Sequence, residues 1–215
     1  MQRGSLRFVA RRKGLVDLLR RKGIRSERVL SAIGSVPREC FMDPTLIELS
    51  YEDKPYPIGS GQTISQPFTV AWQTELLDLK GGEKVLEVGT GSGYQAAVLS
   101  WLGVQLFSIE RQRSLYERTR ILLHSLGCQV NCAFGDGYQG WSDQAPFDCV
   151  LVTAGSATLP EKLLGQLAVG GVMVIPMSQN GVLKMCRIRR CGINDYQTEV
   201  FGECSFVPML EGVEG

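Results

Sequence analysis

Residues 85–99, with the sequence VLEVGTGSGYQAAVL, constrain the fold of this chain more than any other segment. A short apolar run leads into Gly89, Gly91 and Gly93, and a stretch that favours a helix follows. Glycines at such a turn let the backbone turn tightly and approach a ligand, because no Cβ is in the way. The segment therefore predicts a buried strand, a ligand-binding loop and a helix in direct succession.

Strand-like and helix-like segments alternate from this point on. Apolar runs predict strands at 84–89, 104–110, 129–134, 147–154 and 171–177. Helices are predicted between them at 94–101, 112–126 and 160–168. Strands separated by helices form βαβ units, so we predict an α/β fold with a mostly parallel, doubly wound, Rossmann-like sheet. Two further strands, 182–190 and 197–209, are expected to pair antiparallel at its edge.

The N-terminal third of the chain has a different pattern. A basic helix is predicted over 5–22 and a second helix over 27–35, with Ser26 as the N-cap of the second. The stretch 43–68 contains four prolines and is predicted to be a loop, and a helix is predicted at 69–79.

The net charge of +1 hides an uneven distribution along the chain. Residues 1–28 contain ten Lys and Arg against two acids, and the remaining residues contain thirteen Lys and Arg against twenty acids. A basic segment can contact nucleic acid, or it can be a solvated helix face. We favour the helix face and expect no nucleic-acid partner.

Other features of the composition bear on location and on metals. No apolar run approaches the roughly 18 residues that span a bilayer, and the N-terminus lacks the apolar stretch of a secretory signal. The seven cysteines contain no CxxC pair and the chain has one histidine, so a zinc site is not expected. We expect a cytoplasmic protein with free thiols, no membrane association and no bound metal.

The spacing of the glycines separates two classes of nucleotide ligand. A dinucleotide site reads GxGxxG, whereas this loop reads GxGxG and follows Glu87. A carboxylate beside the loop would repel a pyrophosphate, but it suits a ligand with an ammonium group. S-adenosylmethionine is such a ligand, and it is favoured here over a nicotinamide dinucleotide. The alternative is that the glycines only form a tight turn and bind no ligand.

Two more acids follow the next strands of the predicted sheet. Glu110 ends the strand 104–110, where an acid can accept hydrogen bonds from ribose hydroxyls. Asp136 stands between two glycines, where it could hold the exocyclic amine of adenine with Gly137 close to the ring. Each acid alone could also be a solvated strand end or an Asp-Gly turn. The three acids together are more specific, because the carboxyl ends of parallel strands meet at one crevice.

A series of longer motifs points to one family. In chain order they are VPRECF, YEDKPYPIG, GQTISQP, VLEVGTGSGYQAAVL, GDGYQGW, APFDCVLVTA, LPEKLLGQL, GGVMVIP and FVPM. Together they cover residues 36 to about 209, and on them the chain resembles the protein-L-isoaspartate (D-aspartate) O-methyltransferases. That family has the class I S-adenosylmethionine-dependent methyltransferase fold. The chain departs from the family pattern at Ser205, where an arginine is common.

The resemblance implies an activity and a set of site residues. The reaction is methyl transfer from S-adenosylmethionine to the α-carboxylate of L-isoaspartyl, and also D-aspartyl, residues in damaged proteins and peptides. S-adenosylhomocysteine is the product, and the ester recyclises to a succinimide that can reopen to normal aspartate. In the family the serine of TIS, here Ser65, lies next to the methyl group and the substrate carboxylate. Thr63 and Ile64 line the cofactor.

This chemistry explains why residues 59–72, GSGQTISQPFTVAW, carry no charge. A carboxylate with a pKa of about 4 is already deprotonated at neutral pH, so the reaction needs no general base. Attack on a sulfonium removes an anion and a cation together, and a site that excludes water favours that change. We expect Ser65 to orient the carboxylate and His124 to have no catalytic role.

These interpretations imply a single domain, 1–215, and a monomer. Residues 1–68 would form N-terminal helices and a substrate loop, 69–179 the cofactor-binding core, and 180–215 the edge strands and tail. Two alternatives stay open. One is a related methyltransferase that acts on another carboxylate, a modified peptide or RNA, and the other is a binding module without activity.

Overall fold

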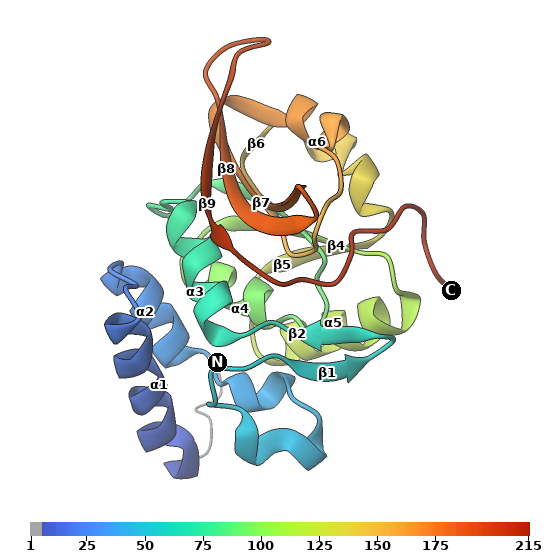
Figure 1. Ribbon diagram of the computed structural model, residues 1–215. Coiled ribbons are helices and arrows are strands. Elements are labelled where there is room, and N and C mark those ends of the chain that lie inside the picture. Colours follow the sequence, from blue (N-terminus) through green and yellow to red (C-terminus); the bar gives the residue numbers. More distant parts are fainter. Residues whose placement is uncertain (1–5) are drawn as a thin grey trace.

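The computed structural model describes residues 6–215, and within this range seven strands form one sheet (Figure 1). The strands are β3 (Lys84–Val88), β4 (Gln105–Glu110), β5 (Val130–Phe134), β6 (Phe147–Val152), β7 (Leu167–Gln179), β8 (Val182–Arg190) and β9 (Tyr196–Glu203). Their spatial order is β5-β4-β3-β6-β7-β8-β9. Neighbours from β5 to β7 are parallel, and β8 and β9 are added antiparallel. The predicted α/β fold, with its antiparallel C-terminal pair, is confirmed.

The strand order reverses at β3. The chain passes from β3 to β4 and β5 on one side of the sheet, and then to β6 and β7 on the other. Such a reversal leaves a crevice outside the carboxyl ends of the strands. Val88 of β3 is in register with Ile109 of β4 and with Val152 of β6, so these three strands end at one level.

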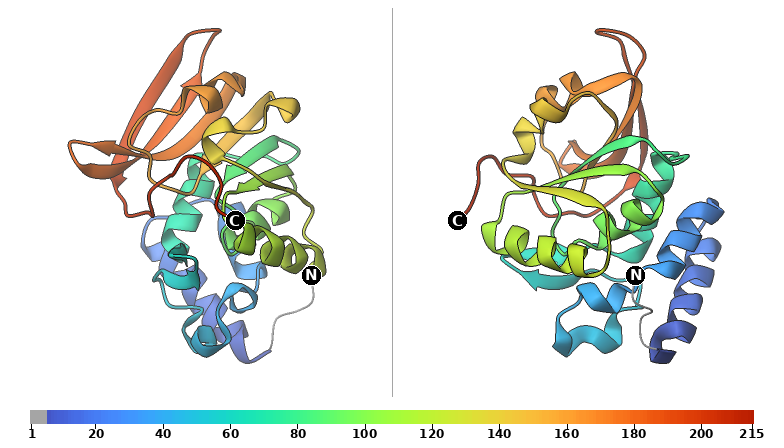
Figure 2. Two further views of the ribbon diagram at one scale, coloured as in Figure 1. Left: turned by 90° about the vertical axis from the view of Figure 1, so that its right-hand side faces the viewer. Right: turned by 180° about the vertical axis from the view of Figure 1, so that it is seen from behind.

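Helices cover both faces of the sheet (Figure 2). They are α1 (Val9–Arg21), α2 (Glu27–Ser35), α3 (Pro67–Leu76), α4 (Tyr94–Trp101), α5 (Arg113–Ser125) and α6 (Glu161–Gly165). Successive side chains of a strand point to opposite faces. Val85 of β3 accordingly packs into the core beneath α3 to α5, whereas Leu86 and Val88 pack with Leu163 of α6.

The stretch 43–68, predicted as a loop, contains a two-stranded antiparallel hairpin. Its strands are β1 (Tyr56–Gly59) and β2 (Gln62–Ile64). The hairpin escaped prediction because its strands are short and contain residues typical of turns, such as Pro57. Short 3₁₀ turns complete the fold at η1 (Leu6–Phe8), η2 (Arg38–Phe41), η3 (Pro44–Leu49), η4 (Gly137–Gln139) and η5 (Ser142–Gln144).

Two predicted boundaries near the C-terminus are wrong. The helix predicted over 160–168 ends at Gly165, because Leu167 is fully buried and pairs with Phe147 as the first residue of β7. A short buried apolar run does not distinguish a helix from a strand by periodicity. The strand predicted over 197–209 ends at Glu203, and the residues that follow cross the carboxyl ends of the sheet.

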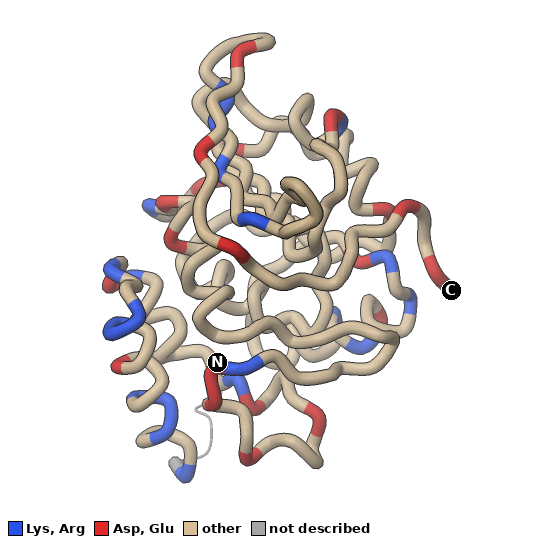
Figure 3. Tube along the Cα trace, viewed as in Figure 1, with Lys and Arg blue, Asp and Glu red and all other residues tan. Residues whose placement is uncertain are grey.

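The basic N-terminal segment forms helix α1, which starts at Val9 after η1, and residue 5 of the predicted helix lies outside the described range. Helix α2 has its predicted bounds, and its N-cap Ser26 accepts a hydrogen bond from the Val29 backbone N–H at 3.4 Å. Basic positions recur along this segment (Figure 3). Several of its cations form ion pairs with acids of this chain: Arg11 with Glu48, Arg12 with Glu39, Arg20 with Glu27 and Lys22 with Asp53. Between residues 6 and 215, no helix is both long and apolar enough to cross a bilayer.

Candidate active site

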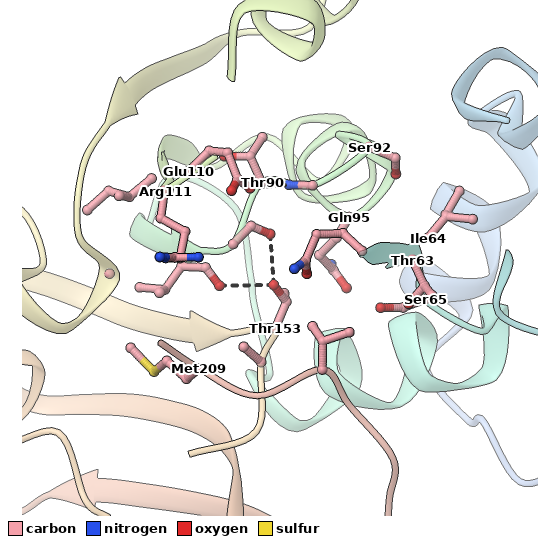
Figure 4. Close-up of a pocket in the computed structure, with 18 of the residues that line it drawn as sticks. Thr63, Ile64, Ser65, Thr90, Ser92, Gln95, Glu110, Arg111, Thr153 and Met209 are labelled. Carbon is pink, nitrogen blue, oxygen red and sulfur yellow. Dashed lines mark hydrogen bonds between the residues drawn. The ribbon is translucent and has the colours of Figure 1, made fainter. Parts of the chain in front are cut away.

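A cavity lies over the carboxyl ends of β3, β4 and β6, at the crevice where the strand order reverses (Figure 4). Segments far apart in the sequence form its walls, chiefly the end of β2, the glycine loop, the ends of β4 and β6, and the C-terminal tail. The predicted site residues that line it are Thr63, Ile64, Ser65, Gly89, Gly91, Glu110 and Gly137. Gly93, Glu87 and Asp136 lie outside this lining.

The glycine loop is shaped by close approaches that only glycine permits. Gly89 has a φ of 97°, and a Cβ there would lie 2.4 Å from Thr153 Oγ1. The Thr153 hydroxyl forms hydrogen bonds with the carbonyl oxygens of Val88 and Gly89, which ties the loop to the end of β6. Gly93 has a φ of 87° and precedes α4, and a Cβ there would lie 2.7 Å from Thr119 Cγ2 on α5. The loop is therefore locked between β6 and α5.

Glu110 lies at the end of β4 and lines the cavity, while its role as a ribose partner stays a prediction. Its side chain is almost fully buried, and its two oxygens accept hydrogen bonds from the backbone N–H groups of Gly91 and Gln112, each at 2.8 Å. A carboxylate oxygen has more than one lone pair, so both oxygens can still accept hydroxyl donors from a ligand. Glu110 thus joins the ligand surface to the glycine loop.

Glu87 lies outside the cavity lining, and among residues 6–215 its buried Oε1 has no hydrogen-bond partner, so its role toward an ammonium group stays a prediction. It is fully buried beneath the loop, on the face of the sheet that α4 and α5 cover, because it shares the orientation of Val85 on β3. The Ser108 hydroxyl donates to its Oε2 and also lies 2.6 Å from the Thr90 hydroxyl in the loop. Burial raises the pKa of Glu87 to about 8. Glu87 therefore supports the loop from below.

Asp136 and Gly137 form the start of the turn η4 at the edge of the cavity. Asp136 Oδ1 accepts a hydrogen bond from the Tyr138 backbone N–H at 2.9 Å, as in an N-cap. Gly137 lines the cavity, and a Cβ there would lie 2.4 Å from Val88 Cγ1. The structural role of an Asp-Gly turn is therefore present, and the role of Asp136 toward a ligand stays a prediction.

Ser65 stands where two hollows meet. It follows β2, and the paired strand β1 is tied to α5 by a 2.8 Å hydrogen bond that Arg118 donates to the Ile58 carbonyl oxygen. The half-buried Ser65 lines the main cavity and also a second cleft, which we call the acceptor-side cleft. The residues that line this cleft are Pro55, Thr63, Ser65, Gln66, Phe68, Thr69, Trp72, Thr153 and 203–207.

The family model for protein-L-isoaspartate(D-aspartate) O-methyltransferases matches residues 10–214. The chain belongs to this family. Among curated relatives, the protein-L-isoaspartate O-methyltransferase of Christiangramia forsetii is 49% identical over 208 residues, which cover 96% of this chain and 97% of that protein. The one of Pelodictyon phaeoclathratiforme is 46% identical and covers 100% of this chain and 97% of its own length.

Solved structures agree with this assignment. A protein-L-isoaspartate O-methyltransferase superposes with a TM-score of 0.81 at 29% identity, over 92% of this chain and 65% of that chain. A putative protein-L-isoaspartate O-methyltransferase from Plasmodium falciparum, in complex with S-adenosyl-L-homocysteine, superposes with a TM-score of 0.82 at 24% identity, over 93% of this chain and 98% of that chain. The fold is therefore the S-adenosylmethionine-dependent methyltransferase fold.

Some lining residues of this methyltransferase were not anticipated from the sequence. The C-terminal tail crosses the cavity, held by hydrogen bonds of 2.8 Å from the Gly155 N–H to the Val207 carbonyl oxygen and from the Met209 N–H to the Gly155 carbonyl oxygen. Further along, Glu214 forms an ion pair with Arg111 at 3.1 Å. The FVPM motif was the available signal, because it is particular to the family, but it gave no position in space.

Proposed function

We propose that this protein transfers a methyl group from S-adenosylmethionine to the α-carboxylate of L-isoaspartyl, and also D-aspartyl, residues in damaged proteins and peptides. Membership of the family supports the activity. The single structural observation that carries the proposal is the place of Ser65, on the wall that the main cavity shares with the acceptor-side cleft. A donor and an acceptor in these two hollows would meet at that residue.

The main cavity fits S-adenosylmethionine in its shape and donor set. Gly89, Gly91 and Gly137 line the cavity without side chains, so their backbone can approach a nucleoside. Glu110 would hold the ribose hydroxyls, and Asp136 with Gly137 would hold the adenine. Thr63 and Ile64 would close the opposite side. When bound, the cofactor supplies a methyl group on a positively charged sulfur, and S-adenosylhomocysteine would occupy the same residues.

The residues around Ser65 suit a reaction that needs no base. The acceptor carboxylate is already ionised at neutral pH, so the protein has only to orient it and exclude water. The Ser65 hydroxyl can donate one hydrogen bond to an oxygen of that carboxylate. The uncharged loop avoids the stronger hold of a cation, which would stabilise the ionised reactant more than the less polar transition state. The methyl ester then cyclises to a succinimide, which can reopen to aspartate.

The structure makes RNA a weaker alternative acceptor. The basic residues of α1 that pair with acids of this chain include Arg12, which bonds both Glu39 and Tyr51 in a partly buried position. Charges used in this way are less available for phosphates. All seven cysteines are free thiols, which supports a cytoplasmic location. We further propose that 1–215 is one domain, with the parts 1–68, 69–179 and 180–215, and that it acts as a monomer without a membrane or nucleic-acid partner.

A direct assay tests the activity. The protein is incubated with methyl-labelled S-adenosylmethionine and with two peptides that differ only in an isoaspartyl or an aspartyl residue. We expect label in the isoaspartyl peptide, released as methanol by base because the product is an ester. Equal labelling of both peptides, or base-stable label on RNA alone, would contradict the proposal.

A further inference from the structure

A buried amide group lines the main cavity with one atom that has no partner. Gln95 lies in the first turn of α4, directly after the glycine loop, and its side chain is almost fully buried. Among residues 6–215, its buried Oε1 accepts no hydrogen bond. Native proteins rarely leave a buried acceptor in this state, because it loses its hydrogen bond to water without a replacement.

The neighbouring helix α3 fixes which way this amide points. Gln95 Nε2 donates to the Thr74 hydroxyl at 2.9 Å, and that hydroxyl donates to the Val70 carbonyl oxygen at 2.7 Å. A threonine hydroxyl has one proton, and the Val70 carbonyl already takes it. If the amide were turned over, Oε1 would face another acceptor and Nε2 would lose its bond. Oε1 is therefore the atom that is left for a ligand.

Other polar side chains on this wall have a partner within the protein. The Thr90 hydroxyl lies 2.6 Å from the Ser108 hydroxyl, and the Ser92 hydroxyl accepts a hydrogen bond from the Tyr94 backbone N–H at 3.3 Å. The Tyr94 hydroxyl is itself buried without a partner, but the Arg38 guanidinium, which lies over the Tyr94 ring, has unpartnered N–H donors of its own. Gln95 Oε1 has no such group beside it in the protein.

The three substituents of the cofactor sulfur indicate which group meets this atom. In the placement proposed above, the ribose lies at Glu110 and the methyl group faces Ser65. The third substituent is a short chain that ends in an ammonium and a carboxylate group. Figure 4 shows Glu110 on one side of the cavity, and Gln95 and Ser65 toward the other. Because the substituents of a sulfonium diverge, this chain leaves the sulfur away from the ribose, toward the side of Gln95.

The chemistry of Oε1 distinguishes the two groups at the end of that chain. An amide oxygen only accepts hydrogen bonds, so it fits the ammonium group and not the carboxylate. It also carries no net charge. An anion in the same place would stabilise the sulfonium, whose positive charge the reaction removes, and would favour the reactant over the transition state.

We propose that Gln95 binds the ammonium group of S-adenosylmethionine by accepting a hydrogen bond at Oε1, and that Thr74 holds the amide in position. The inference rests on the ribose and methyl positions proposed above. S-adenosylhomocysteine has the same ammonium group, so the hydrogen bond is made to the donor and to the product alike.

Calorimetric titration with trimmed ligands tests this inference and needs no methyl acceptor. The ligands are S-adenosylhomocysteine, its analogue without the amino group and its analogue without the carboxylate. Gln95→Met keeps the length of the side chain and removes both polar atoms. It should weaken binding of the two ligands that have the amino group by about 10-fold, and change binding of the third by less than about twofold. Thr74→Val, which frees the amide to turn, should cause a smaller loss that is again specific to the amino group.

Gln73→Met is the matched control. Gln73 is a second buried glutamine, on α3, that does not line the cavity, and its Nε2 donates to the Val152 carbonyl oxygen at 3.0 Å. This variant should keep the wild-type affinities for all three ligands, and thermal unfolding checks that each variant is folded.

Three results would overturn the inference. They are wild-type affinities in Gln95→Met, equal losses for ligands with and without the amino group, and a loss specific to the amino group that appears in Glu87→Gln instead. In each case the methyl-transfer function stands, because the peptide assay tests it separately. If S-adenosylhomocysteine does not bind the wild-type protein, both are wrong.

Discussion

The two hollows that meet at Ser65 are built differently. One wall of the main cavity is the backbone of the glycine loop, which has no room for a Cβ at Gly89, and Glu110 accepts hydrogen bonds from the backbone N–H groups of Gly91 in that loop and of Gln112. The acceptor-side cleft is made of half-buried or exposed side chains such as Trp72 and Glu203. The cofactor is the same in every reaction, so a rigid surface can bind it. Substrate proteins differ in the residues that flank the target, so the cleft that faces them needs a surface that can adapt. This difference predicts that substitutions in the main cavity reduce stability or activity more than substitutions in the acceptor-side cleft do.

Gly89→Ala should have the largest effect. Its Cβ would meet Thr153 Oγ1 at 2.4 Å, and alanine would have to adopt a φ of 97°. Crowding and a left-handed backbone should together lower the free energy of unfolding by about 2–4 kcal/mol. Chemical denaturation measures this loss. Gly165→Ala is the control, because nothing lies within 4 Å of a Cβ at that helical position. Equal stability of the two variants would show that the loop is not rigid.

Ser65→Ala tests the point where the two hollows meet. Removing a hydrogen bond to a charged carboxylate should lower kcat by about 10- to 100-fold, with little change in cofactor affinity. Steady-state kinetics and calorimetry measure the two quantities. Ser60→Ala, at the tip of the same hairpin and 3.1 Å from Ser114 Oγ, should keep the wild-type kcat. A wild-type kcat in Ser65→Ala would show that the Ser65 hydroxyl has no role in the reaction and that the residue only supports its loop.

Glu110→Ala and Asp136→Ala test the cofactor placement. Each variant should weaken S-adenosylmethionine binding by about 1–3 kcal/mol, and Glu110→Ala should do so more because it also releases the Gly91 N–H. Calorimetric titration measures the affinities, with Glu117→Ala on the exposed surface of α5 as control. Unchanged affinity in both variants would contradict the proposed positions of the ribose and the adenine.

Glu87 gives a smaller effect that depends on pH. Burial raises its folded-state pKa from an ordinary value of 4.5 to about 8, so the folded protein keeps a proton that the unfolded chain loses above pH 4.5. The resulting stabilisation is complete below pH 4.5 and is lost as the pH rises through 8. Relative to Glu87→Gln, which stays neutral, wild-type stability should fall by up to about 1 kcal/mol per pH unit in this window.

Denaturation curves from pH 5 to 9 measure that difference. Glu117→Gln, which removes an exposed acid, should show little of this dependence on pH. A stability difference between wild type and Glu87→Gln that does not change with pH would mean that Glu87 is already ionised in the folded protein.

The sequence predicted the part of this architecture that depends on local pattern. Strand and helix alternation fixed the order of elements, and Glu110 could be placed at the cavity because it ends a strand. The burial of Glu87 beneath the loop could not be predicted from its distance to the glycines alone, because it depends on the side of β3 that Glu87 shares with Val85. The acceptor-side cleft could not be predicted, because Glu203 and Trp72 adjoin only after the tail crosses the sheet.

The wall shared by the two hollows has a consequence for their occupants. Thr63, Ser65, Thr153 and Val207 belong to both, so a ligand that orders them from one side lowers the entropic cost for a ligand on the other. Such cooperativity is reciprocal: S-adenosylhomocysteine should tighten peptide binding by the same factor as the peptide tightens S-adenosylhomocysteine. Equal peptide affinities with and without S-adenosylhomocysteine would show that the shared wall is already fixed in the empty protein.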